Sequence, residues 1–498
     1  MEKASLSIAK TFAPFAILFL FFLFSLNPWI DRMALPGYAS YDIKRIAELF
    51  ALLTINSYLV FSTTYRRYSY SIYSKLSRST RLSLVGLFYL GIISSLLAPL
   101  THWALLEVML DTQLFYLVIF IAIHNLIWKK TSDYLLIAII LISALIYTIT
   151  FFVAFMQQHA NPSATYYEFP GFMNLRFFAQ YQIGTIPIIT LPILIMHNKH
   201  KIYAALSYGL ATIWFTLAIL DGSRGLWLSL ILSILLTRTI FKRHLSQWLW
   251  IQIKALMGAI LFFLFILGMI VFSHDYNLSE KFYPLYNSLS DHYTFHALIG
   301  SASARIQLAK TAIQLALNNP LFGVGPLHFS YYDPGDIAAH PHNSILLIAS
   351  EWGIPAALCV SMLLVNGFTQ WIKMQKNKML KQTDKQTISM ILTVSLIAEL
   401  IYSLMSGVTI TPLSQIVFVL ILGWMLGLYH RSDKKIIEST NIHCYLFSLT
   451  IMISTLLLLS LSIVVTHNLP QKEIQWYFQQ QTGQKHFYPR FWVQGELR

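Results

Sequence analysis

The sequence predicts an all-α integral membrane protein with about 12–13 transmembrane helices and one long outer loop that contains an amphipathic helix. Of its 498 residues, 56% are apolar and only 11% are charged, against roughly 25% charged residues in an average soluble domain. The apolar residues gather in runs of about 20, the length that a helix needs to cross a bilayer. This composition excludes a soluble multidomain protein and a disordered chain.

Thirteen runs are apolar enough to be spans, and they divide the chain into four parts. Nine spans with short connections fill residues 1–272, a long loop follows at 273–341, four more spans fill 342–466, and 467–498 form a tail. The runs lie at about 11–30, 46–62, 82–101, 104–127, 134–156, 178–196, 202–220, 225–240, 249–272, 342–369, 387–406, 413–430 and 444–466.

The net charge of +14 has two possible causes, a nucleic-acid partner or membrane topology. With an inside N-terminus, the connections predicted to face inward hold 23 of the 35 Lys and Arg residues. Cytoplasmic loops of membrane proteins carry this excess. We therefore expect a lipid bilayer and no nucleic acid as the partner, and we place 157–177, 273–341 and the tail outside.

The two cysteines, Cys359 and Cys444, exclude a disulfide scaffold, a cysteine zinc site and an iron–sulfur cluster. The long loop carries several histidines, but two of them at i and i+2 with no fixed acidic or cysteine partner make a weak zinc pattern. We expect no metal. The tail is rich in Trp, Tyr and Phe, which either shape an acceptor groove or form an interfacial belt.

Arg224 follows Asp221, Gly222 and Ser223 between two predicted spans at the outer face. Ser223 suits the N-cap of the following span, which puts Arg224 in its first turn. A cation there opposes the helix dipole, whereas an anion arriving from outside would be attracted by the dipole, the free N–H groups and the guanidinium. The alternative is an ordinary arginine at a membrane edge.

Arg305 and His342 are the other two candidates. The pattern after residues 301–304 predicts an amphipathic helix that ends at Asn318, with Arg305 in its first turn. His340 and His342 flank Pro341, which favours a helix start, and a histidine in a first turn is kept neutral by the dipole. A neutral imidazole suits a general base. The alternatives are a solvated arginine on a loop helix and a histidine that is an ordinary satisfied polar residue.

Intramembrane acids are a further group of candidates. Glu107 and Asp111 are spaced i, i+4 in one span, and Glu399 stands alone in another. Acids inside a membrane serve as proton relays or as polar links between helices. They are the feature that most favours a transporter, and we favour the structural role.

Several segments together carry a family resemblance. They are Gly-Ser-Arg-Gly at 222–225, Arg305 ahead of Asn-Pro-Leu-Phe-Gly-Val-Gly at 319–325, His-Pro-His-Asn-Ser at 340–344 with Glu-Trp-Gly at 351–353, and the segment 170–180 with Asn174 and Arg176. In this order they resemble the O-antigen ligase superfamily. That superfamily includes lipopolysaccharide O-antigen ligases, O-antigen polymerases and pilin-type protein O-oligosaccharyltransferases.

The resemblance implies a multi-pass enzyme of the bacterial inner membrane with its active site facing the periplasm. Such enzymes transfer a glycan from undecaprenyl diphosphate to an acceptor hydroxyl, without a metal or another cofactor. Arg224 and Arg305 would then neutralise the departing diphosphate, and His342 would be the base. By the same resemblance, the substrate-binding residues are Arg176, Asn174, His340, Asn343, Gly323 and Gly325.

The acceptor stays open at this stage among lipid A–core, a glycan and a pilin-like protein. The competing class is a transporter or flippase for a lipid-linked oligosaccharide, which predicts critical charges along the membrane interior. The enzyme predicts that Arg224, Arg305 and His342 meet in one outward-facing site.

Overall fold

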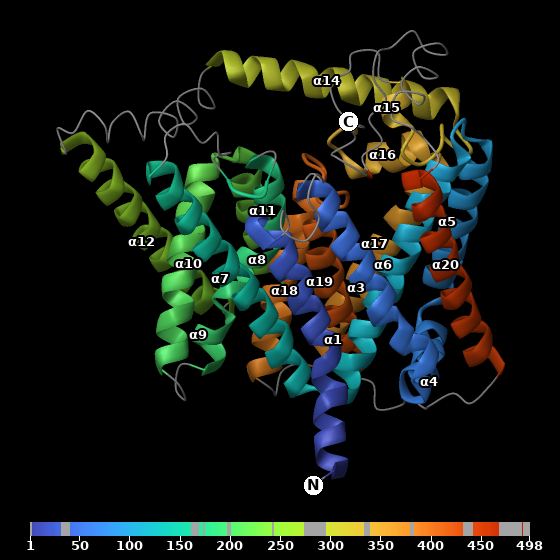
Figure 1. The fold of residues 1–498 in the computed structure, drawn as a ribbon, viewed down its shortest axis with the longest axis horizontal. Helices are drawn as coiled ribbons and strands as arrows, with labels where there is room; N and C mark the ends of the chain where they lie inside the picture. The colour runs from blue at the N-terminus through green and yellow to red at the C-terminus, as the bar shows by residue number, and fades with distance from the viewer. Residues whose placement is uncertain are drawn as a thin grey trace.

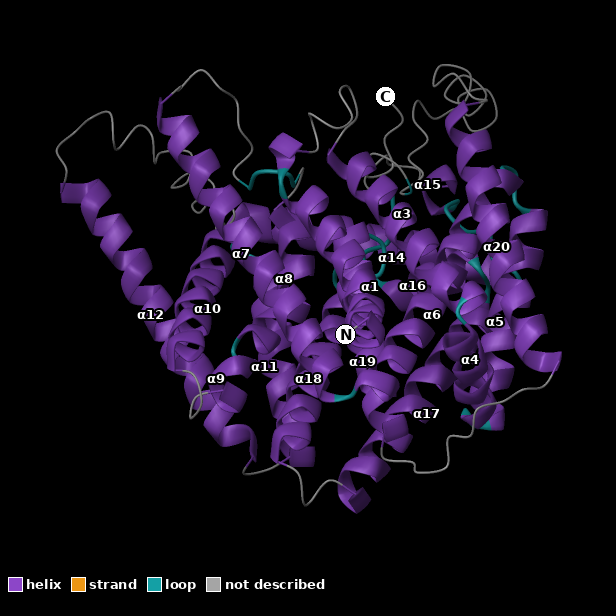
Figure 2. Cartoon of the chain, turned by 60° about the horizontal axis from the view of Figure 1, so that its bottom comes forward, coloured by secondary structure: helices purple, strands orange, loops and turns teal. Residues whose placement is uncertain are grey.

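The structure, a computed structural model, describes residues 2–30, 40–160, 169–172, 175–196, 201–241, 244–272, 295–332, 339–378, 383–431, 442–467 and 491. Every regular element in these ranges is a helix (Figures 1 and 2). The helices are α1 (Glu2–Leu26), α3 (Ser40–Phe61), α4 (Thr63–Lys75), α5 (Arg78–Leu97), α6 (Thr101–Trp128), α7 (Lys130–Ala160), α8 (Leu175–Ile189), α9 (Leu191–Met196), α10 (Lys201–Asp221), α11 (Arg224–Phe241), α12 (His244–Phe272), α14 (Phe295–Asn318), α15 (Phe329–Tyr332), α16 (Ser344–Glu351), α17 (Ile354–Lys378), α18 (Thr383–Ser403), α19 (Pro412–Arg431) and α20 (Ile442–His467).

The number of spans agrees with the sequence. In the described part of the chain, 11 helices are long and apolar enough to cross a membrane. The pair α3 and α4, bent by 94°, makes 12 if it counts as one span, and α1 contributes a shorter apolar helix. All thirteen predicted runs fall on these helices. The prediction of an all-α, multi-pass membrane protein is confirmed.

The helices of the long loop gather at one end of the bundle, which we call the upper end after its place in Figure 1. There α14 extends across the top of the molecule, close to α15 and α16, whereas α4 lies at the opposite, lower end. The predicted topology places the upper end outside the cell.

Four helices form the buried centre of the bundle: α6, α8, α18 and α19. About four fifths of the apolar window of each is buried inside the protein, against 17% for α12 and α17. The outer helices turn apolar side chains such as Leu261 and Phe265 outward, where lipid would solvate them. The centre therefore provides a rigid base for side chains at the upper end.

A buried ion pair joins α7 and α19 at the lower end of the bundle. Arg431 Nη1 of α19 lies 2.8 Å from Asp133 Oδ2 of α7, and Trp424 Nε1 donates to Asp133 Oδ1 at 2.7 Å. Arg431 Nε also donates to Asn125 O of α6. A buried charge pair is tolerated when further hydrogen bonds satisfy it, as they do here. The pair ties α6, α7 and α19 together away from the upper end.

Two predictions about helix bounds are wrong. Helix α14 begins at Phe295, because the alanines and serines of 301–304 continue the helix. Arg305 therefore lies in the third turn of α14, not in its first. The predicted span 342–369 is two helices, α16 and α17, separated at Trp352 and Gly353. Gly353 has φ +92°, a conformation that favours glycine. The backbone N–H of the next residue, Ile354, donates to Pro320 O.

Candidate active site

Arg224 is the first residue of α11, as predicted, and it follows a tight turn. Gly222 in that turn has φ +64°, which glycine adopts without a steric penalty. Ser223 stands where an N-cap was predicted, and its hydroxyl is hydrogen-bonded to Tyr402 Oη at 2.9 Å. Tyr402 thus attaches the turn before Arg224 to the end of α18.

Arg176, near the start of α8, interacts electrostatically with several candidate site residues. Its charge acts on Arg305, on His342 and on Asp221. Helices α8, α11 and α14 therefore bring three arginines from distant parts of the sequence within electrostatic reach of one another. We call Arg176, Arg224 and Arg305 the arginine cluster.

The cluster concentrates positive charge in one place. Loss of water around Arg305, together with the charges of Arg176 and Arg224, lowers the pKa of Arg305. Like charges held together destabilise one another, and a bound anion removes that repulsion. The cluster is therefore suited to an anion with several acceptor oxygens, such as a phosphate or diphosphate.

His342 adjoins this cluster. It lies in the loop before α16, with φ +53°, and not in the first helical turn as predicted. Burial, followed by the charges of Arg176 and Arg305, lowers its pKa to about 4. His342 is therefore neutral at pH 7, as predicted, but the cause is burial beside arginines. Its Nδ1 atom is buried with no hydrogen-bond partner in the described part of the chain.

His340 and Asn343 support the segment around His342. The backbone N–H of His342 donates to His340 Nδ1 at 3.1 Å, and the two ring centroids are 4.3 Å apart. Asn343 is the N-cap of α16, because its Oδ1 accepts from Ile345 N and Leu346 N. The Asn343 side chain, predicted to bind substrate, is therefore engaged in capping this helix. Asn174 lies outside the described residues.

Gly323 and Gly325 make the close backbone approach that was predicted, but to the protein itself. A Cβ atom on Gly323 would stand 2.4 Å from the carbonyl carbon of Glu351, and one on Gly325 would stand 2.4 Å from Ala98 Cβ. The backbone N–H groups of Val324 and Gly325 donate to the last two carbonyl groups of α16, Ser350 O and Glu351 O. These glycines therefore allow close packing of the loop on Glu351 and Ala98, and their predicted role in substrate binding stays a prediction.

The Glu351 side chain binds the same loop through two backbone N–H groups. The side chain is fully buried, Oε2 accepts from Leu327 N at 3.1 Å, and Oε1 accepts from Phe329 N at 2.9 Å. The segments 319–329 and 340–353 are thus packed together; the first follows α14, which contains Arg305, and the second contains His342. The sequence signal for this role is a buried acid ahead of Trp-Gly, in a segment that otherwise contributes to the family resemblance.

Tyr402 is the site residue that sequence reasoning missed. It lies in an apolar run, and only its hydrogen bond with Ser223 and its electrostatic interaction with Arg305 reveal its place. Glu107, by contrast, acts on the buried pair of Arg45 and Glu48 in α3, which fits the structural role that we favoured.

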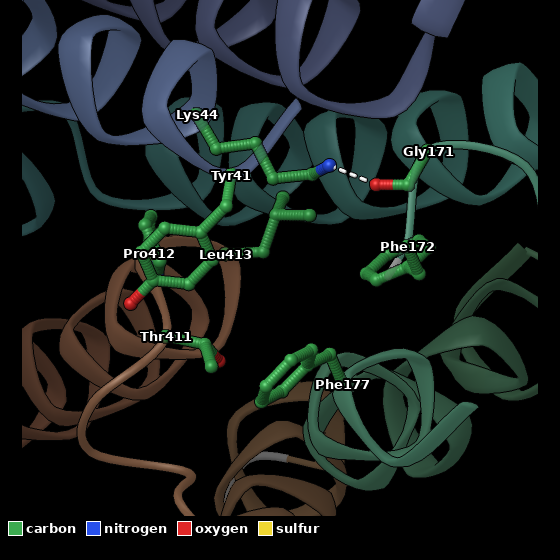
Figure 3. A pocket seen from close by; sticks show the side chains of 8 residues that line it. All are labelled: Tyr41, Lys44, Gly171, Phe172, Phe177, Thr411, Pro412 and Leu413. Carbon is green, nitrogen blue, oxygen red and sulfur yellow. Dashed lines mark hydrogen bonds between the residues drawn. The ribbon is translucent and has the colours of Figure 1, made fainter. Parts of the chain in front are cut away.

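A small pocket lies around Lys44 and is bordered by Phe177, the residue after Arg176 in the sequence (Figure 3). Lys44 Nζ donates to Gly171 O and lies 4.9 Å from the centre of the Phe172 ring. These groups border a pocket of about 20 Å³, room for about one water molecule. The pocket is too small for a sugar ring. It is lined by Tyr41, Lys44, Gly171, Phe172, Phe177, Thr411, Pro412 and Leu413.

Phe491 is the one aromatic residue of the predicted tail that the structure describes, and it is fully buried. Arg45 Nε donates to its carbonyl at 3.3 Å, and the guanidinium lies 5.0 Å from its ring. The other aromatic residues of the tail lie outside the described residues, so the prediction of an acceptor groove stays a prediction.

Histidines elsewhere in the loop form no metal centre in the described part of the chain. No group of three or more His, Cys, Asp and Glu is placed there to hold a metal ion. His328 Nε2 accepts from Leu100 N, and its Nδ1 lies 2.7 Å from Pro326 O, while His274 and His292 lie outside the described residues.

The fold and the site define a multi-pass membrane protein with a cationic site at one end of its helical bundle. Residues 209–361 match the family model described as O-Antigen ligase. The matched region is less than half of the chain, and it includes Arg224, Arg305 and His342. The comparison with curated proteins found no match. The family match confirms the resemblance found in the sequence and supports a membrane enzyme of the glycosyltransferase type.

Proposed function

We propose that the protein transfers a glycan from undecaprenyl diphosphate to an acceptor hydroxyl at the periplasmic face of the bacterial inner membrane. The observation that carries this proposal is the meeting of three arginines from three helices beside a neutral histidine, at the end of the bundle predicted to face outward. The O-Antigen ligase match over the same region supports it.

The arginine cluster is our proposed donor site. A diphosphate offers several charged oxygens, and guanidinium groups bind such oxygens in pairs. A lipid-linked donor keeps its chain in the bilayer, which places its diphosphate at the level of helix ends such as the start of α11. The cluster would hold the donor before reaction and stabilise the negative charge of the departing diphosphate.

His342 is our proposed general base. The acceptor oxygen forms a bond to the anomeric carbon while the bond from that carbon to the diphosphate oxygen breaks. The diphosphate leaves with the bonding electron pair, and the acceptor proton passes to His342. A single displacement of this kind inverts the anomeric centre. Because Nδ1 of His342 is buried, we assign the proton transfer to Nε2.

The donor itself would activate this base. The charges of Arg176 and Arg305 contribute to the low pKa of His342 in the free protein. A bound diphosphate offsets those charges and therefore raises the pKa of His342. The imidazole would gain basicity only when the donor is present, which limits proton transfer to the complete complex.

Lipid A–core is the acceptor that we propose first, since the matched family is described as O-Antigen ligase. A glycan and a pilin-like protein are the alternatives within the superfamily. The test uses purified protein in lipid vesicles with an undecaprenyl-diphosphate glycan and each of the three acceptors. Mass spectrometry should detect one glycosylated acceptor and one undecaprenyl diphosphate released per transfer, and NMR of the product should show an inverted linkage.

The same experiment separates the enzyme from a flippase. A flippase would move the labelled lipid-linked glycan across the vesicle membrane and would leave all three acceptors unmodified. Translocation without product would contradict the proposed function.

A further inference from the structure

The last turn of α18 contacts both halves of the candidate site. Tyr402 there is 2% exposed, and its hydroxyl lies 2.9 Å from Ser223 Oγ, in the turn before Arg224. The following residues contact the segment that contains His342: Ser403 O accepts from Ser344 Oγ at 3.1 Å, and Leu404 O accepts from Asn343 Nδ2 at 3.3 Å. Three consecutive residues thus connect the arginine side of the site to the histidine side.

The ring of Tyr402 also packs on the residue after Arg224. A Cβ atom on Gly225 would stand 2.8 Å from Tyr402 Cε2, so the ring lies directly against the Gly225 backbone. Tyr402 therefore contacts the residues on both sides of Arg224, one by its hydroxyl and one by its ring. Such a two-point contact restricts the direction in which the Arg224 side chain leaves the start of α11.

Tyr402 lies within reach of the rest of the cluster as well. Arg305 and Arg176 both interact electrostatically with it. The hydroxyl is buried, so a substrate would not contact it directly in this arrangement. Its contribution would be made through Arg224.

We propose that Tyr402 is a positioning residue, which holds the turn from Ser223 to Gly225 so that Arg224 points at the same anion as Arg176 and Arg305. The proposal rests on the proposed function, because the anion is the donor diphosphate. A misplacement of about 1 Å at such a site costs up to about 100-fold in rate.

The test removes either partner of the hydrogen bond between Tyr402 and Ser223, with Tyr402→Phe, which also removes the contact of that hydroxyl with Ser406, and with Ser223→Ala. Each variant should lower kcat for glycan transfer between about 10- and 100-fold. The double variant should be no slower than the slower single variant, because both substitutions remove one interaction. Multiplied losses in the double variant would overturn the proposal.

A second double-mutant cycle tests whether the loss of kcat in Tyr402→Phe is caused by a change at Arg224. In an Arg224→Lys background, which keeps the charge but loses the paired hydrogen bonds, Tyr402→Phe should cost less than about twofold further in kcat. A purely structural defect would cost the same in both backgrounds, and that result would also overturn the proposal.

The chain offers a matched control in Tyr181 of α8. Its hydroxyl also meets a serine hydroxyl, Ser143 of α7, at 2.6 Å, and its side chain is equally buried. Tyr181→Phe should lower thermal stability to a similar extent as Tyr402→Phe but should leave kcat within about twofold. Equal losses of kcat in both variants would make the role of Tyr402 structural only.

Binding of undecaprenyl diphosphate, measured with the full-length protein, separates the two proposals. Weaker binding in Tyr402→Phe than in the wild type supports Tyr402 as a positioning residue even if no acceptor is glycosylated, which would count against the proposed transfer alone. Transfer by the wild type with unchanged binding and kcat in Tyr402→Phe would overturn the role of Tyr402 alone.

Discussion

Arg176 and His342, from α8 and from the loop before α16, lie close enough for the arginine charge to lower the histidine pKa. In the protein without a ligand this arrangement is electrostatically unfavourable. It suppresses the charged form of His342, and Arg176 also lies within electrostatic reach of a second arginine, Arg305. A bound anion would remove both effects.

The pH dependence should differ between free and donor-bound protein. His342 is active as a base only when neutral, so activity falls as the pH drops through its pKa. For kcat/KM of the donor, that fall should lie near pH 4. For kcat it should lie at higher pH, since the bound diphosphate raises the pKa of His342. Coinciding acid limbs would contradict the proposed coupling.

Replacing Arg176 with Ala should change that profile as well as the rate. One of the charges that lower the His342 pKa is lost, so the acid limb of kcat/KM should move to higher pH. The donor KM should rise, because a charge-assisted contact is lost. A higher KM with an unmoved acid limb would show that Arg176 acts on the donor and not on His342.

Arg305→Ala should reduce kcat/KM about 10- to 100-fold, since a contact to an ionised group contributes about 1.5–3 kcal/mol. Arg305→Lys should restore only part of the loss, because lysine cannot make paired hydrogen bonds. Lys310, five residues further along α14, provides the control: Lys310→Ala should keep wild-type activity. Equal losses at both positions would point to general surface charge.

Glu351→Ala should destabilise the protein strongly. It leaves the buried N–H groups of Leu327 and Phe329 without acceptors, at about 1–3 kcal/mol each. The measurement is the apparent Tm in detergent. Glu399→Gln is the control, because the Glu399 side chain is equally buried and its oxygens accept no hydrogen bond in the described part of the chain. A Tm loss in Glu399→Gln as large as in Glu351→Ala would contradict this account.

The sequence predicted the spans well because the bilayer imposes one length and one composition on every crossing helix. It also pointed to Arg224 and His342, since ionisable groups stand out at the ends of apolar runs, and to Arg305 through the pattern of the loop helix; the roles of all three stay predictions. It could not predict contacts between distant segments. The break at Gly353 depends on Pro320 and Leu321, and the place of Tyr402 depends on Ser223.

The predicted start of α14 was wrong for a related reason. Residues 301–304 suit a helix interior as well as a cap, so local propensity alone did not fix the first turn. Arg176 was predicted to bind substrate by resemblance only. Its electrostatic interaction with both Arg305 and His342 depends on how α8, α14 and the loop before α16 pack together, which no single segment of the sequence determines.

The central claim is that His342 accepts the acceptor proton at a donor site formed by the arginines. The most direct measurement compares His342→Ala and His340→Ala with the wild type, for transfer and for binding of the undecaprenyl-diphosphate glycan. His342→Ala should lose about 100- to 10,000-fold in kcat with donor affinity nearly unchanged, and His340→Ala should lose less. Equal losses in both variants with activity restored by zinc, or wild-type turnover in His342→Ala, would contradict the account.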